Sequence, residues 1–196
     1  MDRPLRLYSQ AIADLNTSLV NGDKNVIPEL IERSIADLMR DSDVQDIAKT
    51  SGLTERQVAQ IKLHIFFMLH FVDIKNAVNG KMVTTGQGWR YFAPDMDIIE
   101  AWKRLSEGRG LPEDLDVLLP HELGESILVN KGMKYHDAHL IMNEMSNGIF
   151  NWGKIIPEHD VRRPDGTVLA HENYDSWVRP LEDAGEQDDG SVRPLP

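Results

Sequence analysis

The helical fold is indicated first by residues 54–70, which read TERQVAQIKLHIFFMLH. Thr54, followed by Gln57 three residues later, forms the capping-box pattern that marks the start of a helix. Apolar side chains then recur at three- and four-residue steps, which is the spacing of one helical face. They are Val58, Ile61, Ile65, Met68 and Leu69. We therefore predict a long apolar helix that lies centrally in the fold.

Helical periodicity continues on both sides of this stretch. Apolar residues at helical steps, with glycine or proline near the ends, predict further helices. We expect them over about residues 5–21, 28–38, 44–51, 97–108, 120–130 and 136–145. Asn79-Gly80 and the glycines that follow instead suggest a loop or a small hairpin over residues 78–92. The sequence thus predicts an all-α fold, a compact multi-helix domain with at most a minor β-hairpin.

The composition excludes several classes of protein. The chain has 196 residues, a net charge of −11 and no cysteine. Without cysteine, disulfides, thiolate nucleophiles, cysteine-ligated zinc and iron–sulfur clusters are all excluded. No apolar run reaches the roughly 18 residues that span a bilayer, and no apolar signal peptide follows Met1. We therefore expect a protein that is cytoplasmic as synthesised, does not insert into membranes, and is exported, if at all, by a specialised secretion route or a phage.

The acidic charge is concentrated near the C-terminus. Residues 157–196 contain 4 of the 21 basic residues but 10 of the 32 acidic ones, and five of the ten prolines. This composition is typical of a chain that cannot bury a core. We predict a helical domain over residues 1–156 and an acidic, proline-containing, partly disordered extension over residues 157–196.

Residues 119–125, Leu-Pro-His-Glu-Leu-Gly-Glu, carry the most informative chemical pattern. A helix that begins near Pro120 places His121 and Glu125 on one face, one turn apart. Such a pair can bind one divalent ion or act as an acid–base pair, and Glu122, about 100° around the helix, can polarise a water molecule. The pattern is similar to the HExxH arrangement of zinc proteases, but Glu125 stands in place of the second histidine, which weakens a protease interpretation.

A second histidine pattern follows in residues 135–139, YHDAH. Two short helices joined by a turn at Gly132 would form a hairpin that brings His139 back towards His121 and Glu125. Two histidines and one glutamate suit zinc, whereas more carboxylate or water ligands suit manganese or magnesium. The alternative is that these histidines only cap a helix or lie in solvent. No motif indicates an organic cofactor.

His64 lies within the apolar stretch of residues 54–70. A buried imidazole needs a polar partner. Taken alone, His64 is more simply explained as a hydrogen-bonded core histidine than as a ligand. If His121, Glu125 and His139 form a cluster, however, His64 becomes a candidate for the side chain that a third element contributes to it.

A helix-turn-helix is an alternative interpretation of the same region. Ala48, Gly52 and Val58 provide the small residue, the turn glycine and the apolar packing residue of that motif. The residues that would then read DNA bases are Arg56, Gln57 and Gln60. The same spacing occurs in any tight helical hairpin, and residues 1–80, with 9 basic and 11 acidic groups, have no basic excess to attract a duplex.

Several segments occur in an order that is itself informative. They are Gly52-Leu53-Thr54, residues 61–66, Phe92-Ala93-Pro94, residues 98–105, the HExxE motif of residues 121–125, the YxxAH motif of residues 135–139, and Asn151-Trp152. This ordered set, over about residues 43–152, resembles a C-terminal domain found in polymorphic toxins of the Rhs and filamentous-haemagglutinin type.

The resemblance implies a hydrolase that attacks a target inside a competing cell, most commonly nucleic acid, and that has an immunity protein or another protein as its partner. Its active-site positions would be His64, His121, Glu122, Glu125 and His139. We expect His121, Glu125 and His139 to hold a divalent metal ion, Glu122 to act as general base, and His64 to be a further ligand or an acid.

Two other classes of function stay open beside this metal-dependent nuclease. One is the helix-turn-helix regulator, and the other is a non-catalytic helical interaction protein whose acidic extension recruits or shields a basic partner. The acidic balance also weighs against a nuclease, because binding to a polyanion usually leaves a basic footprint. A hydrolase acting on a small-molecule or protein substrate is a further alternative.

Overall fold

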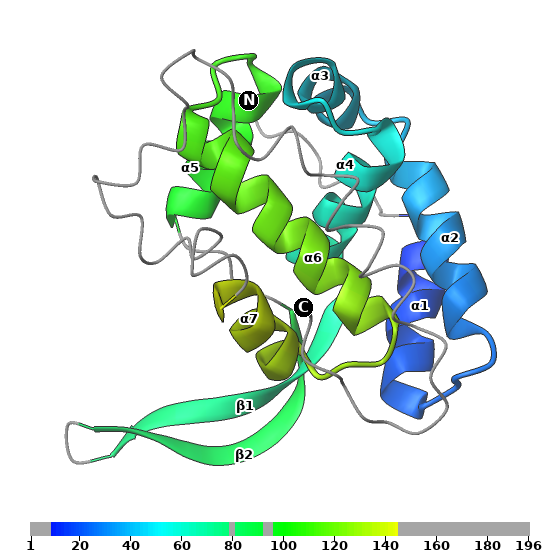
Figure 1. Cartoon of the computed structure of the whole chain (residues 1–196). Helices are drawn as coiled ribbons and strands as arrows, with labels where there is room; N and C mark the ends of the chain where they lie inside the picture. The colour runs from blue at the N-terminus through cyan, green and yellow to red at the C-terminus, as the bar shows by residue number, and fades with distance from the viewer. Residues whose placement is uncertain (1–8, 79–80, 92–95, 145–196) are drawn as a thin grey trace, which may run out of the picture.

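The computed structural model describes residues 9–78, 81–91 and 96–144 (Figure 1). These residues form seven α-helices, two π-helical turns and one two-stranded antiparallel sheet. In chain order the elements are α1 (Gln10–Asn21), α2 (Ile27–Leu38), α3 (Ser42–Ser51), α4 (Glu55–Lys62), η1 (Leu63–Phe67), β1 (Leu69–Val78), β2 (Lys81–Tyr91), α5 (Met96–Ser106), η2 (Asp114–Leu118), α6 (Leu119–Asn130) and α7 (Tyr135–Glu144). The predicted all-α fold with at most a minor β-hairpin is confirmed.

Helix α6 lies at the centre of the hydrophobic core. It crosses the helical body between α4 and α7 and contacts both (Figure 1). Residues 119–128 of α6 are all buried, as expected for a helix that is surrounded by protein. The polar members of that run are His121, Glu122, Glu125 and Ser126. Because buried polar groups need partners, polar side chains of neighbouring elements pair with them, as Gln60 does with Ser126 and His64 with Glu125.

Helix α4 begins with the predicted capping box but is shorter than predicted. It ends at Lys62, a π-helical turn follows, and β1 begins at Leu69, so the prediction of one continuous helix through Leu69 is wrong. Asn16 of α1 lies at this change of structure. Its Nδ2 donates to the backbone oxygen of Phe67 at 2.8 Å, and its Oδ1 accepts from the backbone nitrogen of Leu69 at 2.9 Å. This distant side chain thus satisfies backbone groups at the point where the helix stops.

Strands β1 and β2 form one antiparallel hairpin that extends away from the helical body (Figure 1). They pair along their whole length, with a bulge after Ile74. Exposure alternates along β1, because Val72 and Ile74 are half-buried while Phe71 and Asp73 are exposed. This is the two-residue period of a strand. The hairpin is longer than predicted because residues 69–74 follow this period rather than the helical one.

Lys62, at the end of α4, is buried and is held by two half-buried carboxylates. Its Nζ lies 2.9 Å from Asp41 Oδ2 and 2.6 Å from Asp43 Oδ1. Trp102 of α5 donates from Nε1 to the other oxygen of Asp43 at 2.9 Å. Burial would raise the pKa of Asp43, but the hydrogen bonds from Lys62 and Trp102 outweigh burial and hold the pKa below its usual value. The network ties α3, α4 and α5 together directly before His64.

Within the described ranges, no helix is both long enough and apolar enough to cross a membrane. The predicted acidic extension over residues 157–196 lies outside the described residues. So do two segments of the toxin-like pattern, Phe92-Ala93-Pro94 and Asn151-Trp152.

Candidate metal centre

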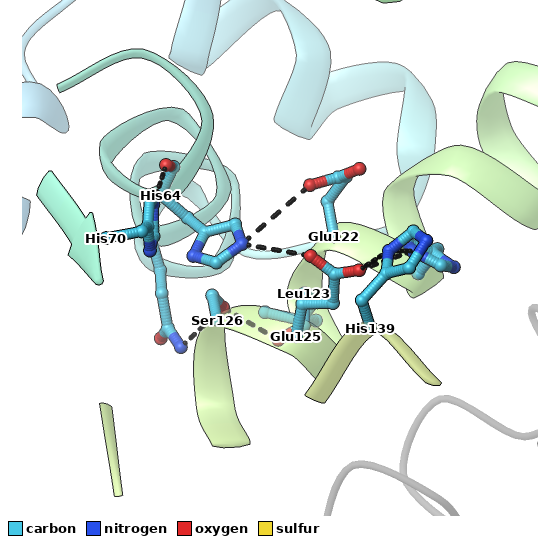
Figure 2. Close-up of polar contacts among 9 residues, drawn as sticks. His64, His70, Glu122, Leu123, Glu125, Ser126 and His139 are labelled. Carbon is cyan, nitrogen blue, oxygen red and sulfur yellow. Dashed lines mark hydrogen bonds and ion pairs between the residues drawn. The ribbon is translucent and has the colours of Figure 1, made fainter. Parts of the chain in front are cut away.

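The five polar side chains predicted to form the site lie together on and around helix α6. Figure 2 labels four of them, His64, Glu122, Glu125 and His139. Turn η1 supplies His64, α6 supplies His121, Glu122 and Glu125, and α7 supplies His139. The i, i+4 spacing puts His121 and Glu125 on one face of α6. Helices α6 and α7 form the predicted hairpin, with Gly132 in the turn at a φ of 92°, which glycine adopts without strain. This hairpin brings His139 to the same face.

Glu125 lies at the centre of the cluster, and both of its carboxylate oxygens are engaged. Oε1 accepts hydrogen bonds from His121 Nε2 at 2.6 Å and from His139 Nδ1 at 2.5 Å. Oε2 accepts from His64 Nε2 at 3.3 Å. Figure 2 shows the Glu125 carboxylate between His64 on one side and His139 on the other. Three imidazoles from three different elements therefore converge on one carboxylate.

The cluster is buried except at His139, whose side chain is 41% exposed. Burial alone would raise the pKa of Glu125, but hydrogen bonds from His121, His139 and His64 outweigh burial and hold the pKa well below its usual range. The hydrogen bond to Glu125 in turn raises the pKa of His139. Glu125 is therefore ionised at neutral pH, and its fixed negative charge favours a cation at this place.

The cluster divides into two groups of ligand atoms that share Glu125. One group is His121, Glu125 and His139, and the other is His64, Glu122 and Glu125. Within each group the ligand atoms all lie within 4.8 Å of one another. In the second group Glu122 Oε2 is 4.0 Å from His64 Nε2. Among the described residues, either group could hold a metal ion.

The donor atoms of the first group fit zinc. Two imidazole nitrogens and one carboxylate oxygen are a ligand set of catalytic zinc sites that keep a fourth position open. Bonds of about 2.0–2.2 Å at tetrahedral angles place neighbouring ligand atoms about 3.3 Å apart. His121 Nε2 and His139 Nδ1 already lie 3.3 Å apart. Glu125 Oε1 would have to move away from each nitrogen by less than about 1 Å, which small side-chain rotations provide.

Two further rings, those of His70 and Tyr135, line the cluster. Neither residue is among the predicted site residues. His70 of β1 donates from Nε2 to the backbone oxygen of His64 at 2.9 Å, and the two rings pack edge-on with 4.6 Å between centroids. Burial, together with the neighbouring His64, lowers the pKa of His70 to about 3, so this ring is neutral. The Tyr135 ring of α7 lies 5.1 Å from the His70 ring and 6.1 Å from the His139 ring. The i, i+4 spacing of Tyr135 and His139 is the sequence signal that points to Tyr135.

The residues of the helix-turn-helix interpretation make contacts within the fold. Arg56 pairs with Glu32 of α2 at 2.6 Å, and Gln57 closes the capping box of its own helix. Gln60 is buried and donates to Ser126 Oγ at 2.9 Å. Helix α4, which would have to enter a DNA groove, is packed against α2, α3 and α6. We therefore do not propose base reading by this helix.

Comparison with protein-family models, curated proteins and solved structures found no match to this chain.

Proposed function

We propose that the protein is a metal-dependent hydrolase and, more narrowly, a toxin-like nuclease that acts in conflict between bacteria or between phage and host. The observation that carries this proposal is the convergence of three histidines on the buried carboxylate of Glu125. Core histidines that serve only packing need a partner each, and nothing requires them to share one. A shared, ionised carboxylate surrounded by imidazole nitrogens is a typical ligand set for a divalent metal ion.

The exposure of His139 supports one direction of substrate access. His64, His121 and Glu125 are at most 2% exposed, whereas the side chain of His139 is 41% exposed. A substrate would therefore reach the centre from the His139 side. Lys134, directly before α7 in the sequence, is also exposed and carries a positive charge.

Hydrolysis at this site requires a polarised bond, an activated water molecule and a proton acceptor. A divalent ion held by His121, Glu125 and His139 would supply the first two, because it polarises a phosphoryl or carbonyl oxygen and lowers the pKa of water. Glu122 is a buried carboxylate of the same cluster outside that ligand group and can accept the water proton. The water oxygen then bonds to phosphorus, the ester oxygen leaves, and Glu122 returns the proton to the leaving oxygen.

The acidic composition does not exclude nucleic acid as the substrate. Of the 32 acidic residues, 10 lie in residues 157–196, outside the helical region that carries the cluster. A bound divalent ion also inverts the local potential on an acidic protein. The ordered segments that resemble polymorphic-toxin domains favour nucleic acid over other phosphate esters.

Bacterial growth after induced cytoplasmic expression tests this proposal. We expect the wild-type chain to arrest growth, and Glu125→Gln and His139→Ala to abolish the arrest at equal levels of soluble protein. His136→Ala is the matched control, because His136 is exposed on the same helix as His139 and belongs to neither ligand group. This control should remain toxic.

The nucleic acids of the arrested cells identify the substrate. Degraded RNA or DNA with the wild-type chain, and intact nucleic acids with Glu125→Gln, would support a nuclease. Arrest with intact nucleic acids would replace the nuclease with a hydrolase for another substrate. Normal growth with soluble wild-type protein would contradict the toxin proposal.

A further inference from the structure

Each of the two carboxylate oxygens of Glu125 faces a different set of candidate metal ligands. Oε1 faces His121 and His139 at 2.6 and 2.5 Å, whereas Oε2 faces His64 at 3.3 Å. Glu122 belongs to the second set, with its Oε2 4.0 Å from His64 Nε2. A single ion bound to the first set would therefore leave a second set of buried ligands outside its coordination sphere.

This second set is the more buried of the two. His64, Glu122 and Glu125 are 2%, 5% and 1% exposed. Two carboxylates are unfavourable in such surroundings unless positive charge lies close to them. A cation held between His64, Glu122 and Glu125 would supply that charge to both carboxylates at once.

We propose that the cluster is a dinuclear centre in which Glu125 bridges two divalent ions. One ion is held by His121 and His139, and the other by His64 and Glu122. This inference rests on the proposed metal-dependent function and specifies the form of its metal site. In two-metal hydrolases of phosphate esters the ions lie about 3.5–4 Å apart, a spacing that one carboxylate spans through its two oxygens.

The two metal positions differ in their donor atoms and in their access to solvent. The first offers two nitrogens and one oxygen, is reached from the His139 side, and suits zinc. The second offers one nitrogen and two carboxylates and lies deeper, and its carboxylates suit manganese or magnesium as well as zinc. In this centre Glu122 is a ligand rather than the proton acceptor. Two ions held there would lower the pKa of a water molecule and stabilise the charge on the leaving oxygen. The water proton would pass to solvent, from which the leaving oxygen would be protonated.

The zinc stoichiometry of the full chain tests the dinuclear centre. Metal-stripped protein is dialysed against buffered free zinc over a series of concentrations, and bound zinc is counted per chain. We expect two ions for the wild type, one for Glu122→Gln and none for Glu125→Gln at the concentration that saturates the wild type. Glu100→Gln, at an exposed glutamate of α5, is the matched control and should keep two ions.

The outcomes separate this inference from the proposed function. One zinc ion per wild-type chain, unchanged in Glu122→Gln, would overturn the dinuclear centre and leave a single-ion hydrolase intact. No bound zinc in folded wild-type protein would overturn both.

Electron paramagnetic resonance of the manganese-loaded wild type gives a second readout that needs no variant. Two manganese ions about 3.5–4 Å apart should be exchange-coupled. A six-line spectrum of isolated ions at full loading would contradict the bridge.

Discussion

Glu125 is the residue on which the site depends, because three imidazoles from separate elements donate to it. A hydrogen bond to a charged group contributes about 1.5–3 kcal/mol, which explains how three of them keep a fully buried carboxylate ionised. The Glu125→Gln substitution keeps the shape of the side chain and removes its charge. It therefore separates the attraction for a cation from the packing of α6.

Zinc should stabilise the wild-type protein but not Glu125→Gln. At a zinc concentration 100 times Kd, binding to the native state adds about 2.7 kcal/mol of stability. For a domain of this size that free energy raises Tm by about 5–10 °C. Thermal unfolding of the two metal-stripped proteins, with and without zinc, measures the shift. Equal shifts in both proteins would place the bound zinc elsewhere on the chain.

Asp43 provides a pH dependence that is separate from the metal centre. Its pKa in the folded protein lies below the usual 3.8, because Lys62 and Trp102 donate to the carboxylate. The unfolded chain therefore takes up the proton first as the pH falls, and the stabilisation present above about pH 4 is lost below it. Asp43→Asn should lose less unfolding free energy than the wild type between about pH 5 and pH 3. Urea denaturation across that range measures the loss of unfolding free energy. Parallel pH profiles for the wild type and Asp43→Asn would show that Asp43 is not the source of the pH dependence.

At the scale of elements, the sequence predicted helices well where a proline or a glycine marks their ends. The expected helices over residues 120–130 and 136–145 correspond to α6, Leu119–Asn130, and α7, Tyr135–Glu144. It failed where a distant side chain ends a helix, because no local pattern shows that Asn16 will bond the backbone at Phe67 and Leu69.

Some residues of the candidate site could be predicted from local sequence patterns, and others could not. His121, Glu122 and Glu125 follow from spacing on one helix, and His139 follows from one short turn. The position of His64 depends on how η1 packs against α6. The sequence indicated only that a buried imidazole at position 64 needs a polar partner. His70 lies in β1, directly after the point to which the predicted helix was expected to continue, and its Nε2 donates to the His64 backbone oxygen.

The contact between α6 and α7 sets the position of His139, and Gly124 permits that contact. A Cβ at this position would overlap the Sδ and Cε atoms of the buried Met142 on α7. Gly124→Ala should therefore push α7 away and weaken zinc binding about tenfold, as displaced supporting groups do at metal sites. This loss is expected although alanine favours a helix by about 1 kcal/mol over glycine.

Calorimetric titration with zinc measures that change. Met142→Ala in the Gly124→Ala background should recover part of the affinity, because it removes the atoms that the new methyl group meets. Equal affinity in the wild type and Gly124→Ala would mean that Met142 moves aside without moving the helix.

At the scale of the whole molecule, the cluster lies where parts of the chain that are distant in sequence meet. Turn η1 and α7 both pack against α6, and α7 also contacts β1 at the base of the hairpin (Figure 1). Two metal ions bound to Glu125 would connect His64 to His139 across this junction. Metal binding and the packing of these elements should therefore reinforce each other.

The most direct test of the central claim is the location of divalent ions in the folded protein. Anomalous diffraction at the zinc absorption edge, from crystals of the zinc-loaded full chain, locates the ions whatever the substrate is. We predict peaks about 2.0–2.2 Å from the Glu125 carboxylate oxygens, one on the His121 and His139 side and one on the His64 and Glu122 side. Zinc-saturated crystals without a peak at Glu125 would contradict the account.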